Sequence, residues 1–437
     1  MYRLFFYYPL DLYIIVMKFI VTKKGEIIMK DFTKMKEKGV PDCDQQIHPI
    51  HLLELFGGIG APRRALENVI KTKVKEDNPE FTKKQLYQEA SKFIKSIDYV
   101  EVLPYAVQAY NQMFDLSNRP QDIRCWNLNV DILVHGSPCQ DYSREGKNDI
   151  NTGRSILYER TLQILDPCPS TGFRELTRQP KVVIWENVPN MAYSHPDVLC
   201  NYLTTMEGYG YTNTFCGSKK YVAKGGYVSP RSVMIEHMLD ASDYGIPQAR
   251  ERFFCVSVLN PYADRYGAFI MPEPVPENER YTLRQFLDLT ASMTDKDNCF
   301  TPTELSITKK VGTQWYVRQA VKGDFGAGPG YVPINEFQRV DLAFPNSQNR
   351  RGRVGDYAST LTTSPRQGVL IGDQFRMFTS LEKLRLMGFR DVDYEKMVKS
   401  GLTDKQIAAL AGNSICVPVL ERIFGCIFRQ YPDMITF

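Results

Sequence analysis

The sequence predicts an α/β protein in which a doubly wound parallel sheet is joined to a smaller, loop-rich domain. Short apolar runs that suit buried strands alternate with helical stretches from His51 onward. A glycine-rich turn, 57–60, follows the first of these runs. The alternation ends near Pro261, where proline, glycine, arginine and amide residues become frequent. Strands that alternate with helices are typical of a parallel sheet covered by helices on both faces.

Each predicted element rests on a local pattern. The first helix has Pro62 in its first turn, where no N–H donor is needed. The stretch 71–98 is rich in lysine and is predicted to be a solvated helical insertion. The predicted strands are 51–56, 99–102, a short strand closed by Asp122-Ile123, 130–134, 181–185 and 253–258. The predicted helices include 62–69, 105–114, 379–387 and 418–428.

The N-terminal segment is expected to be an extension of the fold. Its apolar run is interrupted by Pro9, Asp11 and Lys18, and is too short and broken to span a membrane. Met17 and Met29 are alternative starts, so part of this segment is expected to be a start-site artefact. The predicted segments are the extension 1–48, the main domain 49–265, the smaller domain 266–375, and 376–437, which returns to the main domain.

Composition predicts a soluble globular enzyme in a reducing compartment, which we take to be the cytoplasm. The chain has 437 residues, of which 43% are hydrophobic and 24% charged, as in ordinary globular proteins. A net charge of +4 is compatible with nucleic-acid binding without requiring it. The ten cysteines form no CxxC pair and no Cys/His cluster, so we expect no disulfide framework and no metal site. Cys139 is therefore expected to be a free thiol.

A thiol and a carboxylic acid follow two of the predicted strands. Pro138-Cys139-Gln140 comes after one apolar run, and Glu186-Asn187-Val188 comes after another. The carboxyl ends of parallel strands form the edge where α/β enzymes keep their chemistry. A nucleophile and an acid at this edge suggest attack on an electron-poor ring that needs protonation. A single cysteine is more often an apolar filler, as Cys255 and Cys416 are expected to be.

The glycine-rich turn and two acidic residues form a candidate cofactor site. Phe56-Gly57-Gly58-Ile59-Gly60 lacks Cβ atoms where a ligand must approach the backbone, and a helix N-terminus follows it. Glu101, at the end of the next strand, is placed to bond ribose hydroxyls. Asp122 is placed to accept a hydrogen bond from an adenine amino group. Alone, each feature has an ordinary reading as a turn, surface or capping residue.

Two more groups of polar residues lie near the predicted strand ends. The loop 141–153 carries Ser143, Arg144 and Lys147, and suits closure over a phosphate backbone. Arg250 and Arg252 alternate along an incipient strand, so both guanidinium groups are expected to point into one cleft. A surface loop and surface salt bridges are the ordinary alternatives. All these features nevertheless occur in one order at strand ends, which the ordinary readings leave unexplained.

This order resembles that of the DNA (cytosine-5)-methyltransferase family in its bacterial and phage modification form. The resemblance runs from about Ile50 to Phe428, and its Pro-Cys-Gln, Glu-Asn-Val and Gln-x-Arg-x-Arg motifs are highly specific in combination. Two departures are Val102, where the family often has an aromatic residue, and the long insertion 69–98. The matching pieces are Phe56–Gly60, Glu101, Asp122-Ile123, Gly136–Gln140, Glu186–Val188, Gln248–Arg252, Arg350–Ser364 and Gly412–Ser414.

The resemblance implies a Rossmann-like fold that binds S-adenosyl-L-methionine and methylates carbon 5 of cytosine in duplex DNA. It makes the main domain catalytic and the smaller domain the target-recognition domain. By motif, Cys139 adds to C6 of a flipped-out cytosine and Glu186 is the acid at N3. Arg252 is then the donor to O2, with Arg250 in support. The residues implied around the cofactor are Phe56, Gly58, Ile59, Gly60, Glu101, Val102, Asp122, Ile123, Pro138, Asn413 and Ser414.

Double-stranded DNA is the expected partner of a monomeric enzyme that is not attached to a membrane. A cognate restriction endonuclease is compatible with this reading but cannot be inferred. One alternative is a tRNA cytosine-5 methyltransferase of the same fold, whose Cys-Phe-Thr triplet occurs here as Cys299-Phe300-Thr301. A catalytically idle relative and a methyltransferase for amino or oxygen nucleophiles are the others. The expected DNA contacts are Ser143, Arg144, Lys147, Arg318, Arg339, Arg350 and Arg351.

Overall fold

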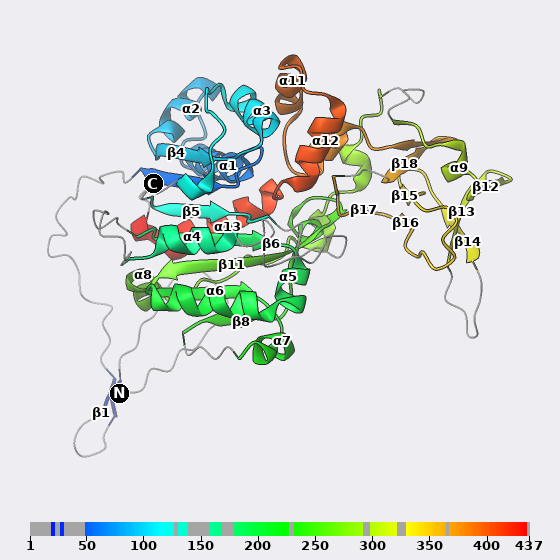
Figure 1. Cartoon of the computed structure of the whole chain (residues 1–437). Helices are drawn as coiled ribbons and strands as arrows, with labels where there is room; N and C mark the ends of the chain where they lie inside the picture. The colour runs from blue at the N-terminus through cyan, green and yellow to red at the C-terminus, as the bar shows by residue number, and fades with distance from the viewer. Residues whose placement is uncertain are drawn as a thin grey trace. The chain divides into compact units, whose positions relative to one another are not determined.

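The computed structural model describes most of the chain after residue 48. The described residues are 19–21, 27–29, 49–125, 130–138, 157–167, 179–226, 231–291, 298–320, 329–363 and 367–434. The chain separates into two units, Met1–Gln46 and Ile47–Phe437. Within the first unit, β1 (Phe19–Val21) and β2 (Ile27–Met29) pair antiparallel. All other described helices and strands belong to the second unit (Figure 1).

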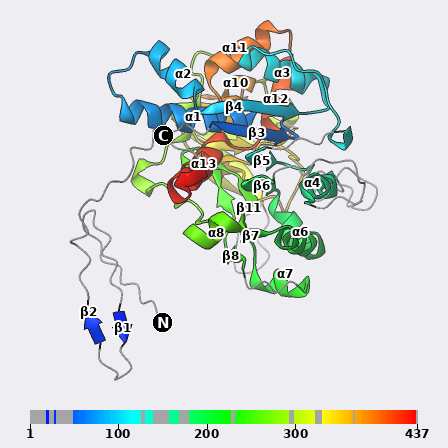
Figure 2. The same cartoon turned by 90° about the vertical axis from the view of Figure 1, so that its left-hand side faces the viewer.

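An eight-stranded sheet is the centre of the second unit. Its strands follow the order β4-β3-β5-β6-β11-β7-β8, and β9 pairs with β11. Figure 2 shows α13 on one side of these strands and α4 and α6 on the other. The predicted α/β class and Rossmann-like sheet are therefore confirmed. The strands are β3 (Ile50–Leu55), β4 (Ile94–Val100), β5 (Ile132–His135), β6 (Val182–Asn187), β7 (Tyr211–Cys216), β8 (Val233–Ile235), β9 (Leu239–Asp240) and β11 (Glu251–Leu259).

The sheet is mixed, so the expectation of an entirely parallel sheet was wrong. Strands β4, β3, β5 and β6 are parallel, whereas β11 runs antiparallel to both of its neighbours, β6 and β7. A central strand is covered on both faces whichever way it runs. Its apolar run therefore predicts burial but not direction.

The helices form where the predicted helical patterns lie, with several additions. In α13 the apolar residues recur every three or four positions, and residues such as Leu420, Ile423, Phe424 and Ile427 are buried. The helices are α1 (Ala61–Asp77), α2 (Lys83–Ser91), α3 (Pro104–Phe114), α4 (Leu157–Leu165), α5 (Pro189–Ser194), α6 (Pro196–Gly208), α7 (Lys219–Lys224), α8 (Asn260–Tyr266), α9 (Pro302–Leu305), α10 (Ser380–Arg385), α11 (Asp391–Lys399), α12 (Asp404–Asn413) and α13 (Val417–Gln430).

One stretch in the second unit resembles a membrane span by composition. Residues Asp404–Gln430 are long and apolar enough, but 67% of the most apolar window is buried in the protein. This stretch forms α12 and α13, and α13 packs along α1. Core helices of folded proteins pass the same test of length and hydropathy, so the stretch is weak grounds for a membrane segment.

Two local predictions near the start of the sheet were wrong. The lysine-rich stretch 71–98 is not all insertion, because α1 continues to Asp77 and Ile94–Asp98 belongs to β4. An edge strand tolerates charged residues on its open side, which hides it from an apolar pattern. No strand forms at Asp122-Ile123; a 3-10 helix, η1 (Ile123–Cys125), begins there, and Ile123 is a single buried anchor.

The smaller region contains two antiparallel sheets rather than loops alone. One has the order β12-β13-β14 and the other β16-β15-β18-β19. A second hydrophobic core supports them, formed by Phe300, Ile307, Val317, Ile334, Val340, Leu342 and Leu370. These strands are β12 (Thr308–Val311), β13 (Gln314–Ala320), β14 (Pro329–Ile334), β15 (Arg339–Asp341), β16 (Val354–Gly355), β18 (Gln367–Ile371) and β19 (Gln374–Met377).

Candidate active site

The glycine-rich turn between β3 and α1 is open on one side and closed on the other. A Cβ at Gly57 would lie 2.7 Å from the Tyr99 ring, and one at Gly60 would lie 2.5 Å from the Tyr110 ring. Gly58, with φ +53°, has no atom within 4 Å of its Cβ position. The half-buried Phe56 also has a positive φ, 57°. The turn therefore rests on two aromatic rings and leaves the backbone of Gly58 accessible to a ligand.

Glu101 lies beside this turn, as the sequence predicted. Its carboxylate accepts three backbone N–H bonds, from Gly58 at 3.1 Å, Val102 at 2.8 Å and Leu103 at 2.9 Å. These bonds fix the carboxylate at the end of β4. Val102 is 59% exposed, so its side chain leaves the neighbourhood of Glu101 open.

Asp122 lies close to Glu101, whereas Ile59 and Ile123 of the candidate cofactor site are buried. Gln121 N–H donates to the Glu101 carbonyl at 2.8 Å, which brings Asp122 close to Glu101. Hydrogen bonds from Arg124, including its backbone N–H at 2.9 Å, lower the pKa of Asp122 to about 2. Ile59 and Ile123 are buried in the core, so only their backbone is left to meet a ligand.

The turn that leads to Cys139 is anchored by strand β6. Cys139 itself lies outside the described residues, as do Ser143, Arg144 and Lys147 of the predicted loop. Before it, the Ser137 Oγ accepts from Trp185 Nε1 at 3.1 Å and from Asn187 Nδ2 at 3.2 Å. Ser137, Trp185 and Asn187 were not predicted to have a role in the site. The one clue in the sequence to this network is Asn187, a polar residue directly after Glu186.

Glu186 is a buried acid at the end of β6. Its Oε1 lies 3.2 Å from Arg252 Nε, and its Oε2 lies 3.4 Å from where a Gly136 Cβ would stand. Burial raises the pKa of Glu186, while the positive charges of Arg252 and Arg250 oppose that rise. A carboxyl group whose pKa is raised in this way keeps its proton to a higher pH than an exposed one, and can donate it to a base nearby.

The antiparallel direction of β11 creates the contact between Glu186 and Arg252. Phe254 pairs with Glu186 in the register of β11 and β6, so the first residues of β11 lie at the carboxyl end of β6. A parallel β11 would carry Arg252 to the opposite edge of the sheet. The predicted proximity of Glu186 and Arg252 therefore depends on β11 being antiparallel, whereas the sequence pattern had predicted a parallel sheet.

Arg250 binds backbone carbonyls that lie next to the site, and its guanidinium is not exposed to a ligand. It is 3% exposed, and its guanidinium donates to the carbonyls of Leu361 at 3.0 Å, Gly412 at 3.0 Å and Ser414 at 2.7 Å. Next to it, β10 (Gln248–Ala249) pairs with β17 (Ala358–Ser359). These bonds join three distant segments of the chain. Ser414 is buried by this packing, while Asn413 is exposed.

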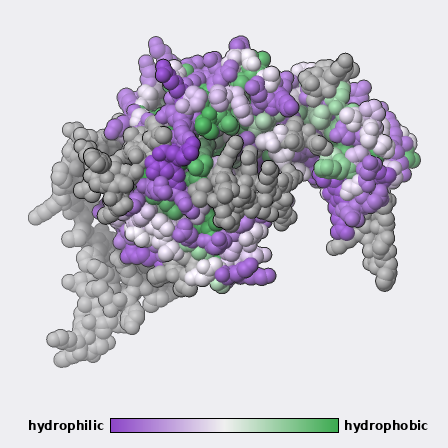
Figure 3. Space-filling view, viewed as in Figure 1, coloured by the Kyte–Doolittle hydropathy of each residue, from purple (hydrophilic) through white to green (hydrophobic). Residues whose placement is uncertain are grey.

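Of the four predicted DNA contacts in the smaller region, Arg339 is buried, whereas Arg318, Arg350 and Arg351 are at least partly exposed. Arg339 is buried and donates to the carbonyls of Tyr357 at 3.1 Å and Gly352 at 2.7 Å, so it braces the backbone and is removed from the set. Arg318 donates to Pro345 O at 2.8 Å, and Arg350 pairs with Asp341 at 2.5 Å. Arg351 is exposed. On the face shown in Figure 3, much of this region is hydrophilic.

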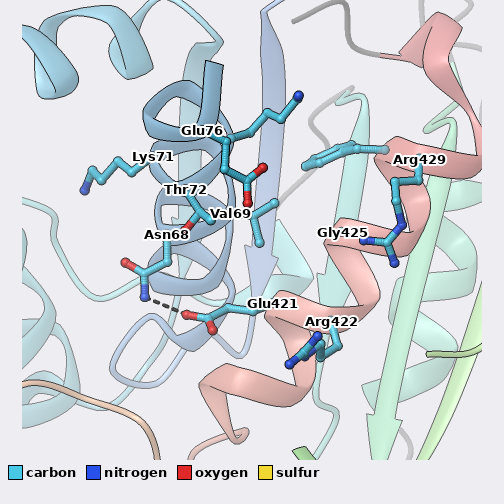
Figure 4. A pocket seen from close by; sticks show the side chains of 11 residues that line it. Asn68, Val69, Lys71, Thr72, Glu76, Glu421, Arg422, Gly425 and Arg429 are labelled. Carbon is cyan, nitrogen blue, oxygen red and sulfur yellow. Dashed lines mark hydrogen bonds between the residues drawn. The ribbon is translucent and has the colours of Figure 1, made fainter. Parts of the chain in front are cut away.

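Two buried thiols and a separate pocket were not predicted to take part in the chemistry. Cys255 and Cys416 are buried in the core, as expected, and burial raises the pKa of each to about 12. A pocket of about 690 Å³ lies between α1 and α13, lined by Asn68 and Glu421 among others (Figure 4). None of its lining residues was predicted to be functional.

Comparison with solved structures defines the class of fold. A Spodoptera frugiperda DNMT2 mutant aligns with a TM-score of 0.54 at 15% identity, over 87% of this chain and 99% of that chain. An Entamoeba histolytica methyltransferase, EhMeth, aligns with a TM-score of 0.52 at 16% identity, over 87% and 98%. At such identities the likeness is one of fold, and the fold is that of these methyltransferases.

The particular family follows from the sequence match. The model of the C-5 cytosine-specific DNA methylase family matches residues 50–429, and the chain belongs to this family. Type II methyltransferase M2.ScrFI of Lactococcus lactis subsp. cremoris is 27% identical over 69% of this chain and 67% of its own length. Type II methyltransferase M.NlaX of Neisseria lactamica is 24% identical over 85% and 94%.

Family membership makes the chain a DNA (cytosine-5-)-methyltransferase with S-adenosylmethionine as methyl donor. The described residues fit this cofactor. The open space above Gly58 admits a ligand to the backbone, and the fixed Glu101 carboxylate offers an acceptor for hydroxyl groups. Gly58, Glu101 and Asp122 would hold the cofactor, and the exposed side chain of Val102 would contact it as well.

Proposed function

We propose that the chain methylates carbon 5 of a cytosine that has swung out of a specific duplex DNA sequence, through a covalent adduct with Cys139. One observation carries the proposal. A buried acid, Glu186, is in contact with Arg252 and lies beside Gly136, three residues before Cys139 in the sequence. An acid and a cation at the exit of the thiol-bearing turn suit the activation of a pyrimidine ring.

The chemistry follows from the weak nucleophilicity of carbon 5. The Cys139 thiolate forms a bond to C6, and the electron pair of the C5–C6 double bond moves toward C5, with charge spreading to N3 and O2. S-adenosylmethionine supplies the methyl group when it is bound. Loss of the C5 proton to a base and expulsion of the thiolate then restore the aromatic ring.

Glu186 and Arg252 act on the charge that this addition creates. Glu186 gives a proton or hydrogen bond to N3, and burial favours its protonated form. Arg252 donates to O2, where negative charge grows in the transition state. Arg250 keeps this arrangement in place through its three carbonyl bonds.

Access to the ring faces requires the cytosine to leave the stack, at a cost of about a few kcal/mol. We assign the loop with Ser143, Arg144 and Lys147 to covering the flipped base. We assign recognition of the sequence to the smaller region, with Arg351 the most exposed of its predicted contacts. Relatives named type II methyltransferases support a role in restriction and modification.

The tRNA alternative is not favoured, because the Cys-Phe-Thr triplet has structural roles in this chain. Phe300 is buried in the second core, and Thr301 caps α9 by accepting from Glu304 N–H at 3.2 Å. The family model and the curated relatives are DNA methyltransferases.

The proposal is tested by trapping the adduct on a duplex that contains 5-fluorocytosine, in the presence of cofactor. The unmodified protein should form a complex that survives denaturation. Cys139→Ser should form none, and the control Cys426→Ser, which alters a half-buried thiol on α13, should behave as the unmodified protein does. An adduct that persists in Cys139→Ser contradicts the covalent mechanism. The target duplex is first identified by bisulfite sequencing of DNA from expressing cells, with tRNA tested in parallel.

A further inference from the structure

The two backbone groups of Gly58, its N–H and its carbonyl, are both hydrogen-bonded by residues at the end of strand β4. The Tyr99 hydroxyl donates to the Gly58 carbonyl at 2.7 Å, and the Gly58 N–H donates to Glu101 Oε2 at 3.1 Å. Tyr99 and Glu101 are two residues apart on an extended chain, so their side chains leave it on the same face. Together they set the orientation of the one residue in the turn that is open to a ligand.

The position of the Tyr99 hydroxyl is itself fixed by aromatic packing. The Tyr99 ring stacks on Tyr110 with centroids 3.7 Å apart, and both belong to a small core with Val107 and Phe114. Tyr110 in turn donates to the buried Glu54 at 2.8 Å. Burial and two nearby carboxylates raise the pKa of Tyr99, so its hydroxyl remains a hydrogen-bond donor.

We propose that Tyr99 is a positioning residue for S-adenosylmethionine. Its hydroxyl holds the Gly58 carbonyl and so restrains the φ and ψ angles of Gly58, which keeps the Gly58 N–H directed at the Glu101 carboxylate before the cofactor arrives. A site already ordered in its binding geometry loses less conformational freedom on binding, which increases affinity. The inference rests on the proposed roles of Gly58 and Glu101 in holding the cofactor.

The test removes only the hydroxyl group and measures the affinity for S-adenosylhomocysteine by calorimetry. One net hydrogen bond corresponds to at most about 1.5 kcal/mol, and this one forms before the cofactor binds, so Tyr99→Phe should raise Kd by no more than roughly 12-fold. Tyr211→Phe is a matched control, because the buried Tyr211 hydroxyl also donates to a backbone carbonyl, that of Pro180, at 2.8 Å. It should lower Tm to a similar extent and leave Kd unchanged. Equal effects of both variants on Kd, or no effect of Tyr99→Phe, overturn the proposal.

A second variant, Gly57→Ala, tests the contact between Tyr99 and Gly58 by displacing the Tyr99 ring. The new methyl group would stand 2.7 Å from the Tyr99 ring and must displace it, so this variant should also weaken binding. Unchanged affinity in a folded Gly57→Ala protein counts against Tyr99. An unmodified protein that fails to bind S-adenosylhomocysteine would instead overturn the cofactor site itself. Neither measurement involves Cys139, so the covalent mechanism is tested separately.

Discussion

The edge of the main sheet and the smaller region use arginine in different ways. At the sheet edge, Arg252 reaches Glu186, a carboxylate that its neighbouring strand presents. In the smaller region, Arg339 and Arg353 are buried and donate to backbone carbonyls of loops. At the sheet edge itself, Arg250 is buried and donates to backbone carbonyls as Arg339 does, so the contrast is between Arg252 and these braced arginines. Where irregular loops leave carbonyls unpaired, arginine satisfies them, and the sequence alone does not distinguish the two uses.

The largest expected effect is at the sheet edge, in Glu186→Gln. Glutamine keeps the shape of the side chain and an acceptor for Arg252 but cannot give a proton to N3. Loss of a general acid lowers kcat by about 10²- to 10⁴-fold. Single-turnover methylation of the target duplex measures this, and the affinity for DNA serves as control. A decrease smaller than about threefold would remove Glu186 from the mechanism and weaken the contrast between the regions.

A buried acid outside the chemistry offers a second test at the same edge. Burial raises the pKa of Glu54 from 4.5 to about 7, although Tyr110 and Arg63 N–H bond to it. Between these values the unfolded chain is ionised while the folded protein retains a proton, so stability falls as pH rises. The loss is on the order of 3 kcal/mol and is complete above pH 7. Denaturant unfolding of the unmodified protein and of Glu54→Gln, from pH 5 to 8, should show a loss of stability that is larger in the unmodified protein by this amount. Parallel curves would contradict the assignment.

The smallest effects should separate two arginines of the smaller region. Arg339→Met removes the donors that the buried guanidinium supplies to the carbonyls of Tyr357 and Gly352, and should reduce stability by about 1–3 kcal/mol. Arg351→Met should leave Tm unchanged, weaken DNA binding, and reduce the slope of log Kd against log salt by about 1. Thermal unfolding and binding titrations at several salt concentrations provide both readouts. The reverse pattern would show that exposure does not identify the DNA contacts.

Much of the sheet edge was predictable because its signals are local. The turn after β3, the acid that follows β4 and the acid that ends β6 each adjoin a short apolar run, and such runs identify buried strands. The strand proposed at Asp122-Ile123 failed because a single buried isoleucine resembles the end of a strand. The strands of the smaller region were missed because their exposed faces are polar and their apolar residues few.

The network around Ser137, Trp185 and Asn187 could not be predicted from either of its two segments. Its hydrogen bonds join residues about fifty positions apart, which become neighbours only when β5 pairs with β6. The same holds for Arg250, whose three acceptors lie more than a hundred residues further along the chain. Long-range partners depend on register and connection, and neither is encoded in a local pattern.

By itself, the sequence determined which residue types stand at the strand ends, because helix and strand periodicity and glycine-rich turns are properties of neighbouring residues. Only the tertiary structure decided that Arg252 meets Glu186 while Arg250 and Arg339 are used internally. That outcome depends on the antiparallel direction of β11 and on which loop carbonyls remained unpaired. Both are settled by the packing of the whole chain, since a buried strand is equally apolar in either direction.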